Sequence, residues 1–141
     1  ISPDHHDPRL KCPGPGGNSR EDDYARHCDL RYVTAVDARC RRLLGDLASA
    51  TAIFEELLSV PDAIAPIDAG LWHAYLSECY LHDDPERAAD CGMTALRLAD
   101  ETASYRAIRA TQPLAIVLRQ HAALPTARAF VDRHRIAVTS Q

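Results

Sequence analysis

Residues 44–57 read LGDLASATAIFEEL, and residues 82–95, which lie 38 positions further along the chain, read HDDPERAADCGMTA. Each stretch begins with a turn that contains aspartate. The positions that correspond after the turn are Ala50 with Ala88, Phe54 with Gly92, and Leu57 with Ala95. A period in this range is typical of stacked helical hairpins, in which each hairpin buries its apolar face against the next. The chain is therefore predicted to consist of consecutive helix pairs.

Helical periodicity extends over most of the chain after residue 22, and no segment shows the period of two that is typical of strands. The predicted helices cover residues 23–44, 47–60, 68–82, 85–100, from 102 or 104 onward, and 125–136. Pro113 lies inside the fifth helix, where proline removes a hydrogen bond, so this helix should kink or divide into two. The predicted fold is all-α, with antiparallel hairpins and five to seven helices.

Particular residues should begin and end these helices. Gly45 should end the first helix, Asp68 should cap the third, and Asp84 should cap the fourth. Phe54 and Trp72 are expected to lie in the core. The first helix carries an apolar stripe of the kind that packs on a core, formed by Leu30, Val33, Val36, Cys40, Leu43 and Leu44.

The 141 residues are 46% hydrophobic and 26% charged, as expected for one globular domain. Residues 1–22 are crowded with proline and glycine, so we expect a tail or strap there and a helical domain over residues 23–141. No apolar run reaches the length of a membrane span, and no leader is visible.

The cysteines form no CxxC motif, which favours free thiols in a reducing, cytoplasmic compartment. They are Cys12, Cys28, Cys40, Cys79 and Cys91. The last three lie in helical patterns, where a free cysteine behaves as a small buried hydrophobic residue.

Charge is distributed unevenly although the net charge is only −4. Residues 44–101 hold twelve acids and two arginines, whereas residues 102–141 hold six arginines and one acid. Either these regions attract one another as neighbouring faces, or the basic end receives an anionic partner. Because aromatic residues make up 6% and the whole chain is acidic, we do not expect direct nucleic-acid binding.

The pattern of small and large residues resembles the tetratricopeptide repeat (TPR). Trp72 matches the aromatic position of that motif's first helix, Ala88 and Ala95 match the small positions of its second helix, and Asp83-Asp84 matches the turn. Gly92 departs from the motif, which usually has an aromatic residue there. The resemblance implies hairpins stacked as a short right-handed solenoid.

Residues 98–135 resemble the C-terminal end of actinobacterial helix-turn-helix transcriptional regulators. The segments that carry this resemblance are Leu98-Ala99-Asp100-Glu101-Thr102, Ser104-Tyr105-Arg106, Leu124-Pro125 and Phe130. With the preceding hairpins it covers residues 28–136, and it does not include the DNA-binding domain of that family. It implies a module for ligand or partner sensing and for self-association within a regulatory system.

In stacked hairpins of this kind, the first helix of each pair lines a concave groove. The polar residues that helical spacing assigns to this groove are Arg39, Arg42, His73, Ser77, Tyr80, Arg106 and Arg109. Arginine pairs bind carboxylate or phosphate by charge-assisted hydrogen bonds. The groove is therefore a candidate site for a protein or peptide segment or a small acidic ligand. The same side chains could instead form a solvated helix face, or a second copy could bury them in a homo-oligomer.

The sequence gives less support to metal binding. Zinc-ligand atoms are present in His5, His6, Cys12, His27 and Cys28, but their spacing matches no recognised zinc-ligand pattern. We expect no metal and no cofactor.

An alternative function is a small enzyme on a helical-repeat scaffold, with the N-terminal strap and its cysteine and histidines closing the site. Glu78 and His82 are four residues apart on one helix face, although a surface contact is the simpler interpretation. Cys79 and Cys91 are interpreted as packing residues. An enzyme should have a deep, enclosed pocket, whereas a binding module should have an open groove.

Overall fold

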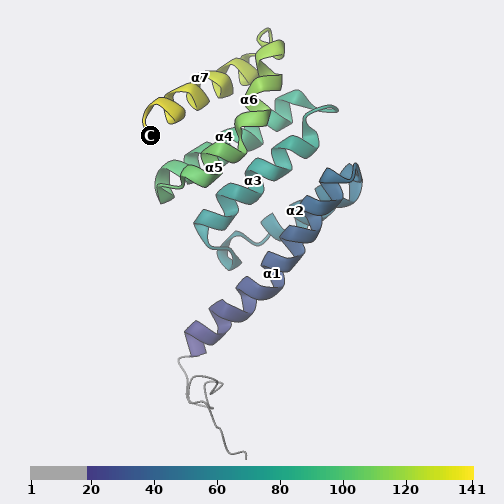
Figure 1. Ribbon diagram of the computed structural model, residues 1–141, viewed down its shortest axis with the longest axis vertical. Helices are drawn as coiled ribbons and strands as arrows, with labels where there is room; N and C mark the ends of the chain where they lie inside the picture. The colour runs from purple at the N-terminus through teal and green to yellow at the C-terminus, as the bar shows by residue number, and fades with distance from the viewer. Residues whose placement is uncertain (1–18) are drawn as a thin grey trace, which may run out of the picture.

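The structure is a computed structural model of the chain, and it describes the backbone of residues 19–141 and the side chains of residues 30–141. Over residues 19–141 the chain is helical and contains no strand. Consecutive helices pack as antiparallel pairs, and the pairs lie side by side (Figure 1). This confirms the predicted all-α fold.

The first two pairs are α1 (Ser19–Leu43) with α2 (Leu47–Leu58) and α3 (Pro66–Tyr80) with α4 (Pro85–Thr102). A short 3-10 turn, η2 (Pro61–Ala63), connects them. The remaining elements are α5 (Tyr105–Ala110), α6 (Gln112–Leu118), the 3-10 turn η3 (Arg119–His121) and α7 (Pro125–Thr139). The last pair therefore has a divided first helix, as the position of Pro113 predicts.

The 38-residue spacing corresponds to equivalent caps in the first two hairpins. Asp46 Oδ1 accepts a hydrogen bond from the backbone N–H of Ser49 at 3.2 Å, and Asp84 Oδ1 accepts one from Arg87 N–H at 3.1 Å. Pro85 follows in the first turn of α4, where its missing N–H leaves no donor unpaired. The same turn chemistry thus begins the second helix of each hairpin.

Gly92 departs from the repeat because neighbouring side chains fill the space that a side chain at position 92 would occupy. A Cβ atom on Gly92 would lie 2.4 Å from Leu114 Cδ2 and 2.7 Å from Phe130 Cε2. Phe54, Gly92 and Phe130 are 38 residues apart, and both phenylalanines are completely buried. Glycine in α4 therefore allows α6 and α7 to approach closely.

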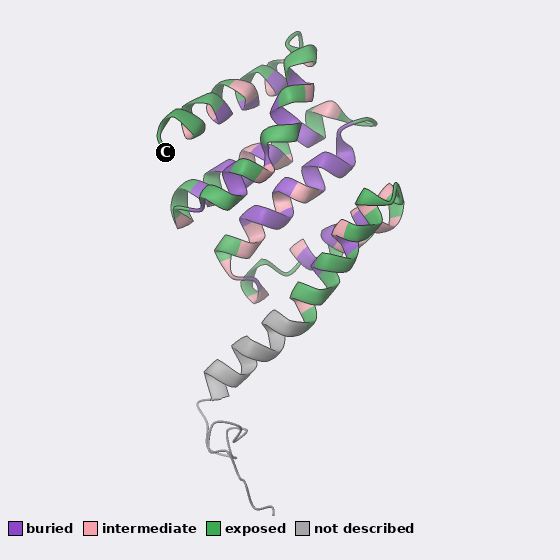
Figure 2. Cartoon of the chain, in the orientation of Figure 1, coloured by how far each residue is buried: buried purple, intermediate pink, exposed green. Residues whose placement is uncertain are grey.

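The core is centred on α3, which packs against α4, α2 and α5. Buried residues follow α3 along most of its length (Figure 2). Trp72 is 4% exposed and Phe54 is fully buried, as the sequence predicts. The first and third hairpins are therefore both positioned by their contacts with the second.

The apolar stripe of α1 faces solvent, contrary to the sequence expectation. The side chains of Leu30, Val33, Leu43 and Leu44 are 65–86% exposed, and Val36 and Cys40 are exposed as well. α1 packs against its neighbours through Ala35 and Ala38, whose small side chains allow close approach. The prediction that Cys40 is buried is wrong, because the alanine face of α1 packs instead of the larger apolar one.

Two helix starts test the predicted caps. Asp68 does not cap α3, because the helix begins at Pro66 and leaves Asp68 within its first turn. That prediction is wrong, although an acid there still favours the helix dipole. Ser104 does cap α5, since its hydroxyl accepts a hydrogen bond from Ala107 N–H at 3.3 Å.

We expect Gly92→Ala to lower the free energy of unfolding by about 1–2 kcal/mol, measured by urea denaturation. Overlap with two fully buried side chains should exceed the gain of about 1 kcal/mol that alanine brings to a helix. Gly70→Ala is the matched control, because a Cβ there would come no closer than 3.3 Å to its nearest neighbour, Leu98 Cβ. Phe130→Leu should partly relieve the defect in a double variant. A Gly92→Ala protein as stable as the wild type would contradict this packing.

Candidate functional site

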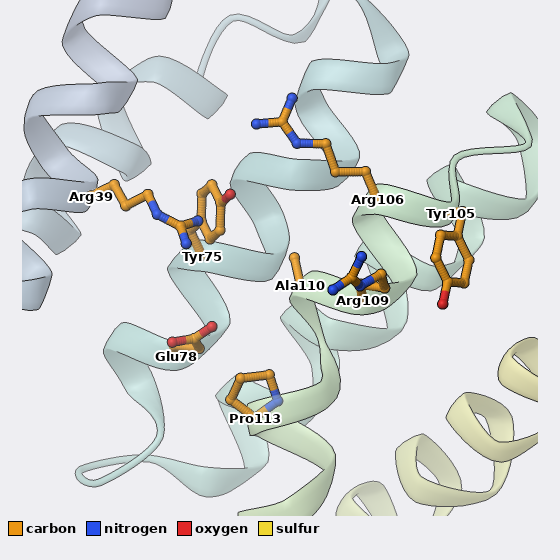
Figure 3. Close-up of a pocket in the computed structure, with 8 residues that line it drawn as sticks. All are labelled: Arg39, Tyr75, Glu78, Tyr105, Arg106, Arg109, Ala110 and Pro113. Atoms are coloured by element: carbon orange, nitrogen blue, oxygen red, sulfur yellow. The ribbon is translucent and has the colours of Figure 1, made fainter.

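A groove lies where α1, α3, α5 and the start of α6 meet. It is lined by Arg39, Tyr75, Glu78, Tyr105, Arg106, Arg109, Ala110 and Pro113, and its volume is about 360 Å³ (Figure 3). We call it the arginine groove. Three of the sequence-predicted site residues, Arg39, Arg106 and Arg109, are brought together here from helices far apart in the sequence.

Arg39 reaches across from α1 to α3. Its guanidinium carbon lies 4.0 Å from the centroid of the Tyr75 ring, a cation–π contact (Figure 3). Its Nη1 atom is buried and has no hydrogen-bond partner among the described residues. A buried donor without an acceptor carries a desolvation cost.

Glu78 is the only acid among the groove residues that the structure describes, and Arg42 binds it. The Glu78 side chain is 7% exposed and the Arg42 side chain is 26% exposed. Burial raises the pKa of Glu78, and the charges of Arg42 and Arg39 partly oppose that rise. The pair joins α1 to α3, and Arg42 is thereby occupied by an internal carboxylate.

Arg106 and Arg109 project from α5 into the groove (Figure 3). Both are exposed, and neither forms an ion pair with any residue from 30 to 141. Ala103, in the left-handed conformation with φ 51°, and the Ser104 cap turn the chain from α4 into α5. This turn brings α5 and its arginines against α3.

The other sequence-predicted residues of α3 lie away from the arginine groove. Ser77 is completely buried, and its hydroxyl donates to the Ala74 carbonyl at 2.6 Å. The Tyr80 hydroxyl donates to Glu55 Oε1 at 2.5 Å. His73 contacts α4, where Cys91 Sγ lies 3.6 Å from His73 Nδ1. Only a narrow strip of α3, which includes Tyr75 and Glu78, borders the groove.

Tyr75 and Glu78 were not among the predicted site residues. They lie three positions apart on α3, and their role depends on the arginines that α1 places opposite them. A buried acid near two arginines carries no local sequence pattern. Its one signal in the sequence is that Glu78 is the only acid in the second half of a largely apolar helix.

The thiols of the described core are held in their protonated form. Burial raises the pKa of Cys91 to about 12 and also raises the pKa of Cys79. A thiol acts as a nucleophile only as the thiolate, so both residues have the character of packing groups. His82 is exposed in the turn after α3, whereas Glu78 is buried against Arg42.

Within the part of the chain that the structure describes, no three His, Cys, Asp or Glu residues are grouped closely enough to hold a metal ion. His5, His6 and Cys12 lie outside the described residues, as do the side chains of His27 and Cys28. Among the described helices, none has the length and apolarity that crossing a bilayer requires.

Comparisons of the chain with protein-family models, with curated proteins and with solved structures gave no match. The functional argument therefore depends on the geometry of the arginine groove.

We expect Arg42→Ala to lower the free energy of unfolding by about 2 kcal/mol at pH 8, because it leaves the Glu78 carboxylate buried without its partner. The Arg42 charge opposes the rise in the pKa of Glu78 that burial causes, which means that it stabilises the ionised carboxylate. Removal of Arg42 should therefore destabilise the fold only at pH values where Glu78 is ionised. The deficit should therefore shrink as the pH falls to 4, where Glu78 is mostly protonated in both the folded and the unfolded chain.

Arg41→Ala is the control on the same helix. Arg41 pairs with Asp37 at 3.1 Å and Asp46 at 3.7 Å, and all three side chains are exposed. Surface pairs of this kind contribute at most about 1 kcal/mol. Urea titrations at both pH values give the comparison, and an equal Arg42→Ala deficit at pH 8 and pH 4 would contradict the assigned role.

Proposed function

We propose that this chain is a non-enzymatic interaction module built from TPR-like hairpins, and that it holds an acidic peptide segment or small acid in the arginine groove. The observation that carries the proposal is the meeting of Arg39, Arg106 and Arg109 at one groove. None of the three has a carboxylate partner among residues 30–141, while the acid of the groove, Glu78, is bound by Arg42. Guanidinium groups placed in this way bind carboxylates by forked hydrogen bonds.

The walls of the groove suit a peptide better than an inorganic anion. Tyr75, Tyr105 and Pro113 add apolar and aromatic surface beside the arginines. Aromatic residues and arginine are enriched where proteins bind one another. Because residues of four helices line the groove, a short extended segment could contact all of them.

The cellular setting is part of the proposal. The resemblance to actinobacterial regulators supports a role in a regulatory system, with the acidic partner controlling a larger assembly. Cys40, Cys79 and Cys91 are free thiols, which suits a reducing, cytoplasmic compartment.

A second candidate function is self-association through α1. Its exposed apolar stripe, which includes Val33, Val36 and Leu43, lies opposite the alanine face that packs on the core. A contiguous exposed apolar surface marks an interaction site more often than single exposed residues do. A second copy of α1 is a suitable cover, because a two-fold dimer would bury the same stripe twice.

We expect Arg106→Ala to raise the dissociation constant of a fluorescein-labelled (Glu-Leu)5 decapeptide at least tenfold, measured by fluorescence anisotropy. A lost charge-assisted hydrogen bond of about 1.5–3 kcal/mol corresponds to tenfold or more. Arg128→Ala is the control, because Arg128 is an exposed arginine of α7 outside the groove. The (Gln-Leu)5 peptide should bind more weakly. Equal affinities for the two peptides, or an unchanged constant for Arg106→Ala, would count against the groove.

We expect the wild-type chain to sediment as a dimer and Val33→Glu/Leu43→Glu to sediment as a monomer with an unchanged helical circular dichroism spectrum. Charges in the stripe would have to be buried without partners in the dimer. Ile67→Glu, which alters an exposed apolar residue of α3, should leave the dimer intact. A wild-type chain that stays monomeric at all concentrations would exclude this second function.

A further inference from the structure

A second cavity lies between α5, α6 and α7, and we call it the C-terminal cavity. Its volume is about 440 Å³, within the range of small-molecule sites. Tyr105 and Arg109 border both this cavity and the arginine groove, so the two sites share α5 as a wall. Figure 3 shows Tyr105 projecting from α5 on the opposite side from Arg106.

The walls of the C-terminal cavity are largely apolar. Ile108 of α5, Ile116 of α6, and Val131 and Val138 of α7 all line it. Ile108 is buried, whereas Ile116 and Val138 are about half exposed, so the apolar surface runs from the core to the cavity mouth. An apolar body inside the cavity would be removed from water, which is the main source of affinity in such sites.

One polar group of the wall is left without a partner. His134 is 5% exposed, and its Nε2 atom is buried with no hydrogen-bond partner among the described residues. Its ring packs against Phe130, with centroids 5.9 Å apart. Buried polar atoms are nearly always hydrogen-bonded in folded proteins, and this unpaired one belongs to a residue that lines the cavity.

The charged groups of the wall have one sign. Arg109, Arg119 and Arg135 come from α5, η3 and α7, and no acid is among the residues that line the described cavity. Arg135 has a weak surface contact with Asp132 at 3.6 Å, whereas Arg109 and Arg119 form no ion pair within residues 30–141. Cations around an apolar interior favour an anion that carries an apolar tail.

We propose that the C-terminal cavity binds a small amphipathic carboxylate, such as a medium-chain fatty acid. Its hydrocarbon tail would lie between α6 and α7, and its carboxylate would bind the arginines. This site shares Tyr105 and Arg109 with the arginine groove, but the proposal does not depend on peptide binding there. A protein helix on the same surface is the competing occupant, and the volume of the cavity, with its apolar wall and three arginines, favours the small ligand.

Isothermal titration calorimetry of the full chain tests the proposal with sodium decanoate, sodium hexanoate and decyltrimethylammonium bromide as probes. We expect one decanoate to bind per chain. Affinity should fall about fourfold per methylene removed, so hexanoate, which is four methylenes shorter, should bind about 250-fold more weakly. The cationic probe should show no saturable binding, because it lacks the group that arginines recognise.

Variants separate this cavity from the rest of the molecule. Arg119→Ala/Arg135→Ala should weaken decanoate binding at least tenfold, and Val138→Trp, which fills the mouth, should abolish it while the melting temperature stays within a few degrees. Arg106→Ala, which alters the arginine groove alone, should leave decanoate binding unchanged.

Three results would overturn the proposal: decanoate binding no tighter than hexanoate, equal binding of the cationic probe, or undiminished binding to Arg119→Ala/Arg135→Ala. If Val138→Trp instead dissociates a dimer in analytical ultracentrifugation and decanoate has no effect on that dimer, the surface belongs to a second copy of the chain. Loss of peptide binding with decanoate binding retained would contradict the groove and leave this cavity in place.

Discussion

The burial of α3 between α2, α4 and α5 is the constraint on which the rest of the structure depends. This helix carries side chains that are almost or completely buried, among them Trp72, Leu76 and Ser77. Their packing fixes the positions of the neighbouring helices against α3. Close packing of small residues in α4, above all Gly92 against Phe130, then sets the position of α7. Because the first and third hairpins both pack on the second, a change in α3 or α4 should disturb both of them.

The arginine groove is a consequence of this packing. The contacts that hold α1 on α3, the Arg39–Tyr75 stack and the Arg42–Glu78 pair, also form one wall of the groove. α5 supplies the opposite wall, because the left-handed Ala103 and the cap at Ser104 direct it back toward α3. Fold stability and the placement of cationic side chains therefore share the same residues.

Local chemistry was sufficient to predict the helices, the cap at Asp84 and the break at Pro113, because each depends on neighbouring residues in the chain. The packing side of α1 could not be predicted in this way. Ala35 and Ala38 are buried instead of the more apolar stripe because of the shape of the partner helices, which local sequence does not give. Arg39, Arg106 and Arg109 line one groove, and the sequence could place them together because cationic residues recur on the first helices. His73, Ser77 and Tyr80 lie elsewhere because α3 is enclosed on most sides. No local sequence pattern marks Glu78 or His134 as a residue of these sites.

The most direct test of carboxylate recognition is a nuclear magnetic resonance titration that follows the arginine side-chain Nε–H signals while the acidic peptide is added. We expect the signals of Arg39, Arg106 and Arg109 to shift together and to saturate at one peptide per chain. Arg42, already bound to Glu78, and Arg128, outside the groove, should stay unchanged. Equal shifts at Arg128, or no shift at the three groove arginines, would contradict a carboxylate site in the arginine groove.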